Sequence, residues 1–374
     1  MPWEERSTMC LREGFVKLAE MEETNMSQLC REYGISRKTG YKWLKRSQLG
    51  MGMDDLSKRP QHTPQKITEE MEQVLIDTRK DHPTWGPRKI RRVLENKNIK
   101  ELPSISTISE VFKRNGLIDT AVSLKHKAYT AFESPSPNDL WQMDFKGNRS
   151  ISKDCNPLSV LDDHSRYLLG LRSCRNQQRE TVVVELTQLF REYGMPIRFL
   201  MDNGSPWGGC HDREKFTALE VWLLRLDIDV THGRAYHPQT QGKVERFHRT
   251  FEEYLTRTCV DQPFDSYQTH FDAFREEYNT IRPHEAIGMD VPIHKYIKST
   301  RAFPETMPAI LYDTGSIVRK VDVSGRISFK NREWKIGKAF YGLPVVLVPA
   351  ENVDGVFRVS FMNHIVETID LSIE

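Results

Sequence analysis

"FLMDNGSPWGG", residues 199–209, places one carboxylate, Asp202, at the end of an apolar run and directly before an Asn-Gly pair. Asn-Gly is a strong turn signal, and a preceding Asp can cap the turn, so the stretch alone is consistent with a simple turn. The preceding residues 179–196, "RETVVVELTQLFREYGMP", predict an amphipathic helix that ends at Gly-Met-Pro. The apolar segment 197–202 then predicts a buried strand with Asp202 at its carboxyl end, where α/β sheets place ligands.

The segments around this helix and strand predict a mixed sheet flanked by helices. "LWQMDFKG" (140–147) reads as a strand that contains Asp144, and "LSVLDDHSRYLLGLRS" (158–173) reads as two strands joined by a turn. Three strands therefore precede the first helix. A helix at about 213–226, the short strand "DIDVTHG" (227–233) and a further helix that begins near Gln239 complete the pattern.

Length and composition indicate a multidomain protein that does not span a membrane. A chain of 374 residues is too long for one ordinary core. It is 38% apolar and 28% charged, and it has no apolar run long enough to cross a bilayer. The N-terminal "MPWEERSTMC" does not resemble a signal peptide, so we expect a cytoplasmic protein. The six cysteines include no C-x-x-C pair, which argues against a disulfide framework or a zinc ribbon.

Charge is distributed unevenly along the chain. Residues 1–130 contain 24 Lys and Arg against 18 Asp and Glu, a net +6, which leaves 30 against 34, a net −4, for the rest. The basic first part suggests a nucleic-acid partner, and the acidic remainder can supply metal-binding carboxylates.

"MSQLCREYGISRKTGYKWLKR" (26–46) predicts a helix-turn-helix, with a turn at Gly34 and a second helix capped by Ser36. A cationic second helix can enter the major groove of DNA. The alternative is a solvated basic face on a structural helix pair. The candidate DNA-contacting residues here are Arg37, Lys38, Lys42, Lys45 and Arg46.

A second helical region follows a polar, Pro-containing stretch. Thr68 caps its first predicted helix, Pro87 lies near the start of the second, and the third ends at Gly116. This region is either a second DNA-binding unit or a packing module with a solvated charged face. Its candidate DNA contacts are Arg88, Lys89, Arg91 and Arg92. Residues 119–138 lack periodicity and end in Ser-Pro-Ser-Pro, which is typical of an interdomain linker.

Five stretches resemble the core of bacterial insertion-sequence transposases, which have a retroviral-integrase-like catalytic core with three acidic residues. They are "DFKG", "LDDHSRYLLG", "FREYGMPIRFLMDNGSPWG", "HPQTQGKVERFHRT" and "YNTIRPHEAIGMDVP". "LCREYGISRKTGYKWLKR" and "HPTWGPRKIRRVLE" resemble the DNA-binding region of the same family. The resemblance covers nearly the whole chain and does not depend on a single short motif.

The resemblance implies a multidomain fold: an all-α helix-turn-helix N-terminal region, an α/β ribonuclease-H-like catalytic core and a small C-terminal β-barrel. We expect a helix-turn-helix domain (1–60), a second helical DNA-binding domain (64–118), a linker (119–138), an integrase-like core (139–298) and the barrel (313–374). Alternating segments between 317 and 371 predict about five strands for the barrel, joined to the core by a linker around 299–312. The barrel either contacts DNA, as in integrases, or serves as a capping or dimerising domain. Its candidate basic residues are Arg319, Lys320, Arg326, Lys330, Arg332 and Lys335.

Asp144, Asp202 and Glu245 correspond to the three catalytic, metal-binding carboxylates of the family. By the family's arrangement, Asp144 bridges two Mg²⁺ ions while Asp202 and Glu245 each bind one, and Mn²⁺ can substitute. Chemistry supports this choice independently, because carboxylates are the hard ligands that Mg²⁺ prefers, and two ions can assist both sides of an in-line phosphodiester displacement. Each acid also has a structural interpretation: a strand-edge charge, a turn former, and a helix-surface partner of Arg249. Together with the strand order, the set favours a catalytic site.

Two features depart from the family pattern. Between Asp202 and Glu245 lie 42 residues, a long spacing that the loop "SPWGGCHDREKF" accounts for. Glu252 stands where many relatives have a DNA-facing Lys or Arg, so Lys243, Arg246 and Arg249 become the candidates for that contact. We interpret Asp162 and Asp163 as turn residues, and His237 and His248 as either site-steadying or ordinary packed or solvent-facing side chains.

The expected activity is that of a DNA transposase. It would bind the terminal inverted repeats of an insertion sequence, cut to expose a 3′-OH and join that end to target DNA, with double-stranded DNA as partner. The active species would be a homodimer or higher oligomer on DNA, associated with the bacterial nucleoid. The alternatives are a catalytically inactive DNA-binding regulator derived from a transposase, and a plain nuclease of the same fold.

Overall fold

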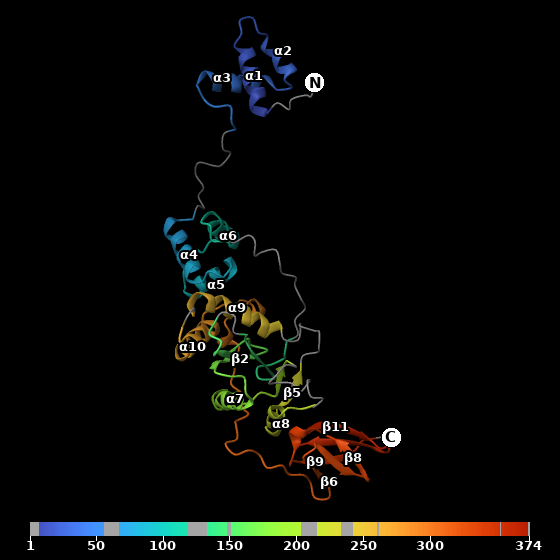
Figure 1. The fold of residues 1–374 in the computed structure, drawn as a ribbon. Helices are drawn as coiled ribbons and strands as arrows, with labels where there is room; N and C mark the ends of the chain where they lie inside the picture. The colour runs from blue at the N-terminus through green and yellow to red at the C-terminus, as the bar shows by residue number, and fades with distance from the viewer. Residues whose placement is uncertain are drawn as a thin grey trace. The chain divides into compact units, whose positions relative to one another are not determined.

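The chain folds as two units, Met1–Ile67 and Thr68–Glu374. The computed structural model describes residues 7–55, 67–118, 133–147, 151–202, 215–232, 242–259, 262–351 and 353–372. Figure 1 labels helices and strands of both units along the chain. None of the helices within these ranges is both long and apolar enough to cross a membrane.

Three helices form the N-terminal unit: α1 (Thr8–Ala19), α2 (Met26–Glu32) and α3 (Arg37–Gln48). The turn between α2 and α3 is made at Gly34, which has a φ of 63°. Ser36 caps α3, because its Oγ accepts a hydrogen bond of 3.1 Å from the backbone N–H of Thr39. The predicted helix-turn-helix is confirmed, and α1 is an additional, unpredicted helix. Their shared core consists of Phe15, Val16, Leu29, Cys30 and Trp43.

Three more helices begin the second unit: α4 (Glu69–Asp81), α5 (Pro87–Asn96) and α6 (Ile105–Arg114). The hydroxyl of Thr68 caps α4, and Pro87 opens α5, as predicted. The buried apolar side chains of this helical region are Leu75, Ile90, Val93, Leu94, Ile108, Val111 and Phe112.

A five-stranded sheet in the order β3-β2-β1-β4-β5 forms the centre of the second unit. The strands are β1 (Leu140–Phe145), β2 (Asn156–Asp162), β3 (Leu168–Cys174), β4 (Arg198–Met201) and β5 (Asp229–His232). The first three strands form an antiparallel meander, whereas β1 and β4, and β4 and β5, pair in parallel. The predicted mixed sheet is therefore confirmed, with β1 and β4 as neighbours.

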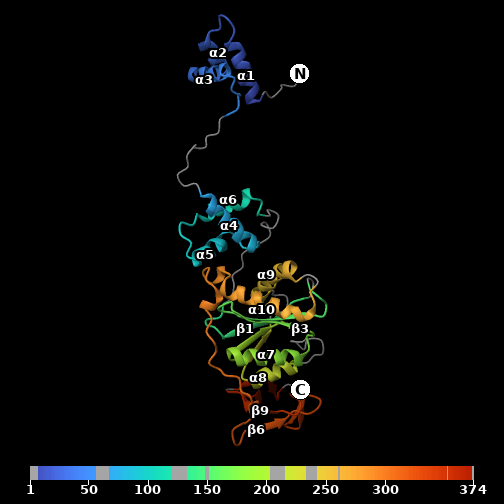
Figure 2. The ribbon, with the colours of Figure 1, turned by 90° about the vertical axis from the view of Figure 1, so that its left-hand side faces the viewer.

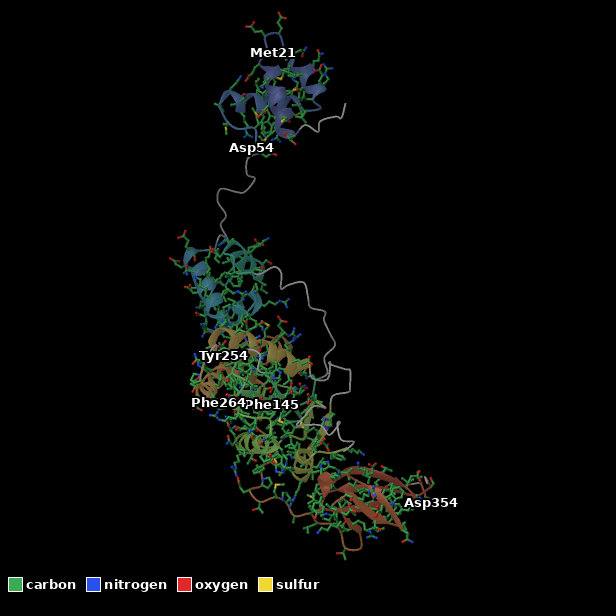
Figure 3. All side chains as sticks on the ribbon, in the orientation of Figure 1. Met21, Asp54, Phe145, Tyr254, Phe264 and Asp354 are labelled. Carbon is green, nitrogen blue, oxygen red and sulfur yellow. The ribbon has the colours of Figure 1, made fainter. Side chains whose placement is uncertain are left out.

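Helices cover both faces of this sheet (Figure 2). On one face lie α7 (Arg179–Tyr193) and α8 (Ala218–Arg225), and on the other lie α9 (Gly242–Thr258) and α10 (Phe264–Thr280). Figure 3 labels Tyr254 of α9 and Phe264 of α10, the two helices on this second face. Helix α10 was not predicted, although its buried aromatic residues recur at helical spacing in the sequence: Tyr267, Phe271, Phe274 and Tyr278.

The C-terminal strands form an open sheet, so the predicted closed β-barrel is wrong. They are β6 (Ile317–Lys320), β7 (Arg326–Phe329), β8 (Arg332–Lys335), β9 (Pro344–Pro349), β10 (Val356–Phe361) and β11 (His364–Asp370). The order β11-β10-β9-β6 leaves β6 and β11 as edges among the described residues. The four-stranded sheet stays open because β7 and β8 pair with each other instead of extending it. They pack on it through side chains, and the ring centroids of Phe329 and Phe357 lie 4.8 Å apart.

The segment expected to be a linker around 299–312 is bound to the core in its first part. The backbone N–H of Ser299 donates to the Tyr193 carbonyl at 2.8 Å, and that of Met195 donates to the Arg301 carbonyl at 2.7 Å. Phe303 packs against the sheet core. Residues 299–303 are therefore part of the core surface, because their backbone and side chains have partners there. Of the other predicted linker, 119–132 lies outside the described residues.

Candidate active site

Asp144 and Asp202 lie at the carboxyl ends of two neighbouring parallel strands. Leu140 of β1 pairs with Arg198 of β4, and Gln142 pairs with Leu200. Continuing this register by two residues brings Asp144 level with Asp202, which directly follows β4. This edge of an α/β sheet is where ligands bind. Phe145, the next residue on β1, is labelled in Figure 3.

The electrostatics of Asp144 show that the predicted acids influence one another. The pKa of Asp144 is raised to about 7, chiefly by burial and then by the negative charges of Asp202 and Glu245, whereas a hydrogen bond from the Phe145 backbone acts to lower it. Glu245 lies in the first turn of α9 and is exposed. The fold thus brings the fields of all three carboxylates together at Asp144.

His248, one turn after Glu245 on α9, connects that helix to the sheet. Its Nε2 forms a hydrogen bond of 2.8 Å with the Oγ of Ser159, whose hydroxyl also lies 3.0 Å from the backbone carbonyl of Asp144. Its Nδ1 lies 3.7 Å from the Asp144 carboxylate. Burial, and then the charge of Lys146, lower the His248 pKa to about 3, so the ring is neutral and this approach is not an ion pair. Of the two histidines considered, His248 borders the acids and His237 lies outside the described residues.

His232 at the end of β5 braces the backbone of Asp202. Its Nδ1 donates to the Asp202 carbonyl at 2.9 Å, and its Nε2 lies 2.6 Å from the carboxylate of the buried Glu220. The hydrogen bond with Glu220 is the main cause that raises the pKa of His232, against the effect of burial. His232, Glu220 and Ser159 were not predicted as site residues, because no motif in the neighbouring sequence distinguishes them.

The donor chemistry of the acids suits a hard divalent cation. Within the described ranges, no three Asp, Glu, His or Cys side chains stand close enough to enclose a metal ion. The fit instead rests on Asp144, a largely buried carboxylate whose negative form is disfavoured by its burial and by the charges of two further carboxylates. A bound cation would relieve that repulsion, and oxygen ligands of this type are those that Mg²⁺ prefers.

On α3, four of the five candidate DNA-contacting residues are exposed, and Arg46 is buried. Arg46 is only 8% exposed, donates to the Gly52 carbonyl at 2.5 Å and stacks on the Trp43 ring at 4.8 Å. Its position differs from the expectation, because its guanidinium supports the helix core. The exposed set is Arg37, Lys38, Lys42 and Lys45.

The basic residues of α5 divide between the surface and internal contacts. Arg88 is exposed, whereas Arg91 pairs with Glu95 at 3.3 Å and Arg92 donates to the Met289 carbonyl at 3.2 Å. Burial lowers the pKa of Lys89 to about 8, and the charge of the nearby Arg282 lowers it too. This part of the chain therefore has features of the packing module that the sequence left open.

The three candidates on α9 also divide. Arg246 and Arg249 are exposed. The Lys243 side chain is only 12% exposed and forms an ion pair of 2.5 Å with Asp163, which is completely buried. The Lys243 ammonium is thus paired within the protein, contrary to the expectation that it faces DNA, and Asp163 serves as its buried partner.

Basic residues of the C-terminal strands are partly engaged with their own sheet. Arg319 donates to the Ser328 carbonyl at 3.0 Å, and Arg326 pairs with Glu333 at 2.7 Å. Lys320, Lys330, Arg332 and Lys335 are exposed. Lys215 ahead of α8 donates to the Val366 carbonyl at 2.9 Å, which ties this sheet to the core.

Family models match along most of the chain. Two models described as integrase core domain match residues 134–238 and 226–292. The C-terminal domain of IS481 family transposases matches 316–374, and a homeodomain-like domain matches 39–112. The sequence resemblance to insertion-sequence transposases with an integrase-like core is thereby confirmed.

Retroviral polyproteins are among the relatives. The Gag-Pro-Pol polyprotein of Simian retrovirus SRV-2 is 29% identical over 121 residues, which cover 32% of this chain and 6% of that one. The Gag-Pol polyprotein of Avian reticuloendotheliosis virus is 24% identical over 128 residues, 34% of this chain and 10% of that one. The similarity thus spans a small part of each polyprotein.

A solved structure, the HTLV-2 integrase catalytic core domain in complex with magnesium, aligns with 44% of this chain and all of that one, at 14% identity and a TM-score of 0.35. The integrase-like fold of the core is supported by the matching integrase core models and by the strand order β3-β2-β1-β4-β5.

Proposed function

We propose that this chain is a DNA transposase that binds the terminal inverted repeats of an insertion sequence, cleaves the DNA strand there and joins the exposed 3′-OH to target DNA. The observation that carries the proposal is the parallel pairing of β1 with β4, together with the charges that act on Asp144. Asp144 and Asp202 end adjacent parallel strands, and the charges of Asp202 and Glu245 both act on Asp144.

In this proposal Asp144, Asp202 and Glu245 are the residues that would hold Mg²⁺. The chemistry that such ions supply when bound is activation of the attacking oxygen and stabilisation of the leaving oxygen in an in-line displacement. No protein nucleophile is required, because water attacks first and the 3′-OH attacks second. The neutral ring of His248, fixed by Ser159, leaves the Asp144 carboxylate without a competing cation at that position.

The exposed residues of α3 are proposed to contact the repeats, with Arg37, Lys38, Lys42 and Lys45 meeting phosphates and base edges. On the core, Arg246 and Arg249 project from the same helix as Glu245 and are proposed to contact the DNA near the cut. We propose the same division of the chain as the sequence suggested, with recognition in 1–60 and chemistry in 139–298.

The experiment is cleavage and joining of a labelled duplex that carries the inverted repeats flanking the gene, with Mg²⁺ or Mn²⁺. Asp144→Asn, Asp202→Asn and Glu245→Gln should each abolish cleavage and leave repeat binding largely intact. A variant that cuts at nearly the wild-type rate would remove its residue from the site. Binding without cleavage by the wild-type chain would favour an inactive regulator, and cleavage without joining would favour a nuclease.

A further inference from the structure

Alternate residues from β1 and from Lys146, which directly follows it, meet successive turns of α9. The backbone N–H of Val244 donates to the Gln142 Oε1 at 3.3 Å. His248 stands 3.7 Å from Asp144, and Lys146 forms an ion pair with Glu252. Side chains two apart on a strand share a face, so Gln142, Asp144 and Lys146 all face this helix.

The spacing of these contacts fits one arrangement of strand and helix. Two strand residues advance about 6.6 Å. Four helix residues advance about 6 Å. The pairs 142 with 244, 144 with 248 and 146 with 252 therefore form a ladder, in which β1 and α9 run in the same direction with nearly equal steps. Sliding α9 by one turn would leave Val244 or Glu252 without its β1 partner.

The first contact of the ladder is buried and fully connected. Gln142 is 1% exposed, and its Nε2 donates to the buried Asp163 Oδ1 at 2.6 Å. Asp163 in turn pairs with Lys243, the residue before Val244. The first backbone N–H groups of a helix have no partner within the helix, and Gln142 supplies an acceptor for one of them. The turn that receives this support is the one that contains Glu245.

The last contact acts on the same stripe of α9 as Glu245. Residues 245, 248 and 252 follow the i, i+3, i+7 spacing that aligns side chains along one side of a helix. Lys146 is 8% exposed, so its charge is placed largely out of water and needs the Glu252 carboxylate. Glu252 thus completes the ladder instead of facing DNA.

We propose that Gln142 and Lys146 are positioning residues that set the register of α9 on β1 and thereby place Glu245 beside Asp144. Asp163 and Lys243 hold Gln142 and the start of α9 in this register. The catalytic consequence rests on the proposed function of the three acids, whereas the register itself is a property of the protein alone.

The test uses the full-length chain and two independent readouts: hydrogen exchange of backbone amides in 242–252 without metal, and the Mg²⁺ dissociation constant by calorimetry. Gln142→Met keeps the side-chain length and removes both hydrogen bonds. It should speed exchange at 244–248 by about tenfold, the equivalent of one buried hydrogen bond. It should also weaken Mg²⁺ binding several-fold.

Gln268→Met is the matched control. Gln268 of α10 joins its helix to β3, with its Nε2 on the Leu171 carbonyl at 3.0 Å and its Oε1 accepting from the Ser173 N–H at 2.9 Å. It should lower the melting temperature about as much as Gln142→Met, yet leave exchange at 244–248 and Mg²⁺ affinity unchanged. An equal effect of both variants on those two readouts would overturn the proposal.

A charge exchange tests the far end of the ladder. Lys146→Glu and Glu252→Lys each oppose like charges, and each should speed exchange in the 242–252 segment. The double variant restores an opposite pair and should return exchange to within about twofold of wild type. Additive damage in the double variant would contradict the ladder. Wild-type protein that binds no Mg²⁺ would instead contradict the proposed function, and the exchange rates would still decide the register.

Discussion

His232 joins two carboxylate-bearing residues: it donates one ring N–H to the backbone carbonyl of Asp202 at 2.9 Å, and its other nitrogen meets buried Glu220 at 2.6 Å. A carbonyl accepts only, so Nδ1 carries a proton, and the contact with a carboxylate favours a proton on Nε2 as well. The raised pKa of His232 agrees with this imidazolium form. The fourth and fifth strands of the sheet are thereby tied at the proposed site.

His232→Gln should lower stability and reduce strand cleavage, because Asp202 loses its brace and Glu220 loses a charged partner. We expect a loss of about 1–3 kcal/mol at pH 6. A raised folded-state pKa means that this contribution is complete below the unfolded pKa, near 6.5, and disappears as pH rises through the folded value. Chemical unfolding of both proteins between pH 5.5 and 9 measures the difference, which should shrink with increasing pH. A difference that grows with pH would refute the imidazolium assignment.

Asp144→Asn should make the metal-free protein more stable at pH 8. The Asp144 pKa rises from 3.8 to about 7 in the folded state, so the folded chain binds this proton more tightly than the unfolded chain. Wild-type stability therefore falls as pH increases between about 4 and 7, and the amide removes that loss. Thermal melts in EDTA should show a higher melting temperature for the variant at pH 8 and convergence near pH 4. Added Mg²⁺ should raise the wild-type melting temperature more than that of the variant.

Lys42→Ala and Arg46→Ala should have different effects, although both residues lie on α3. Lys42 is exposed, so its loss should weaken repeat binding and reduce the slope of log affinity against log salt by about one. Arg46 is buried, and its loss should lower the melting temperature of the N-terminal unit by removing the Gly52 contact. Fluorescence anisotropy across a salt series and thermal melts separate the two effects. Stable protein with a reduced salt slope for Arg46→Ala would place that residue on DNA.

Gly194→Ala should loosen the segment 299–303 from the core. Gly194 has a φ of 77°, and a Cβ there would stand 2.5 Å from the Ser299 carbonyl oxygen. Alanine in this backbone conformation costs about 1–2 kcal/mol before the clash is counted. Denaturant unfolding should show at least that loss, and limited proteolysis should cut near 299–303 faster. Wild-type protease resistance would contradict the docking of this segment.

Under the proposed function, strand transfer should require two or more chains on DNA, because an insertion sequence has two ends and each chain has one set of the three proposed catalytic acids. The test mixes an Asp202→Asn chain, which binds repeats, with an active chain that lacks residues 1–60. Restored joining would show that recognition and catalysis are divided between chains. Binding of one chain to both DNA ends would raise the effective concentration of the second end at the catalytic core, without any new contact. Joining of paired ends by a complex with the mass of one chain on DNA would contradict the prediction.

The sequence alone determined the elements whose signals are local. The turn at Gly34 with its Ser36 cap, the cap at Thr68 and the apolar strand that delivers Asp202 follow from turn chemistry and periodicity within a few residues. The same signals gave the order of strands and helices in the core up to α9, whereas α10 was not predicted. The three acids were also selected from the sequence, through this order and a family resemblance.

Tertiary structure decided which side chains meet. The alternation that puts Gln142 on the same face as Asp144 is visible in the sequence, but its partners Asp163 and Val244 are 21 and 102 residues away. Arg46 and Lys243 are basic, as residues of a DNA-facing surface often are. In the structure, however, Arg46 is buried and Lys243 pairs with the buried Asp163. Charge along the chain does not specify burial, since burial depends on which elements pack together. The open C-terminal sheet has the same cause: alternation predicts strands, whereas pairing between distant strands decides whether a sheet closes.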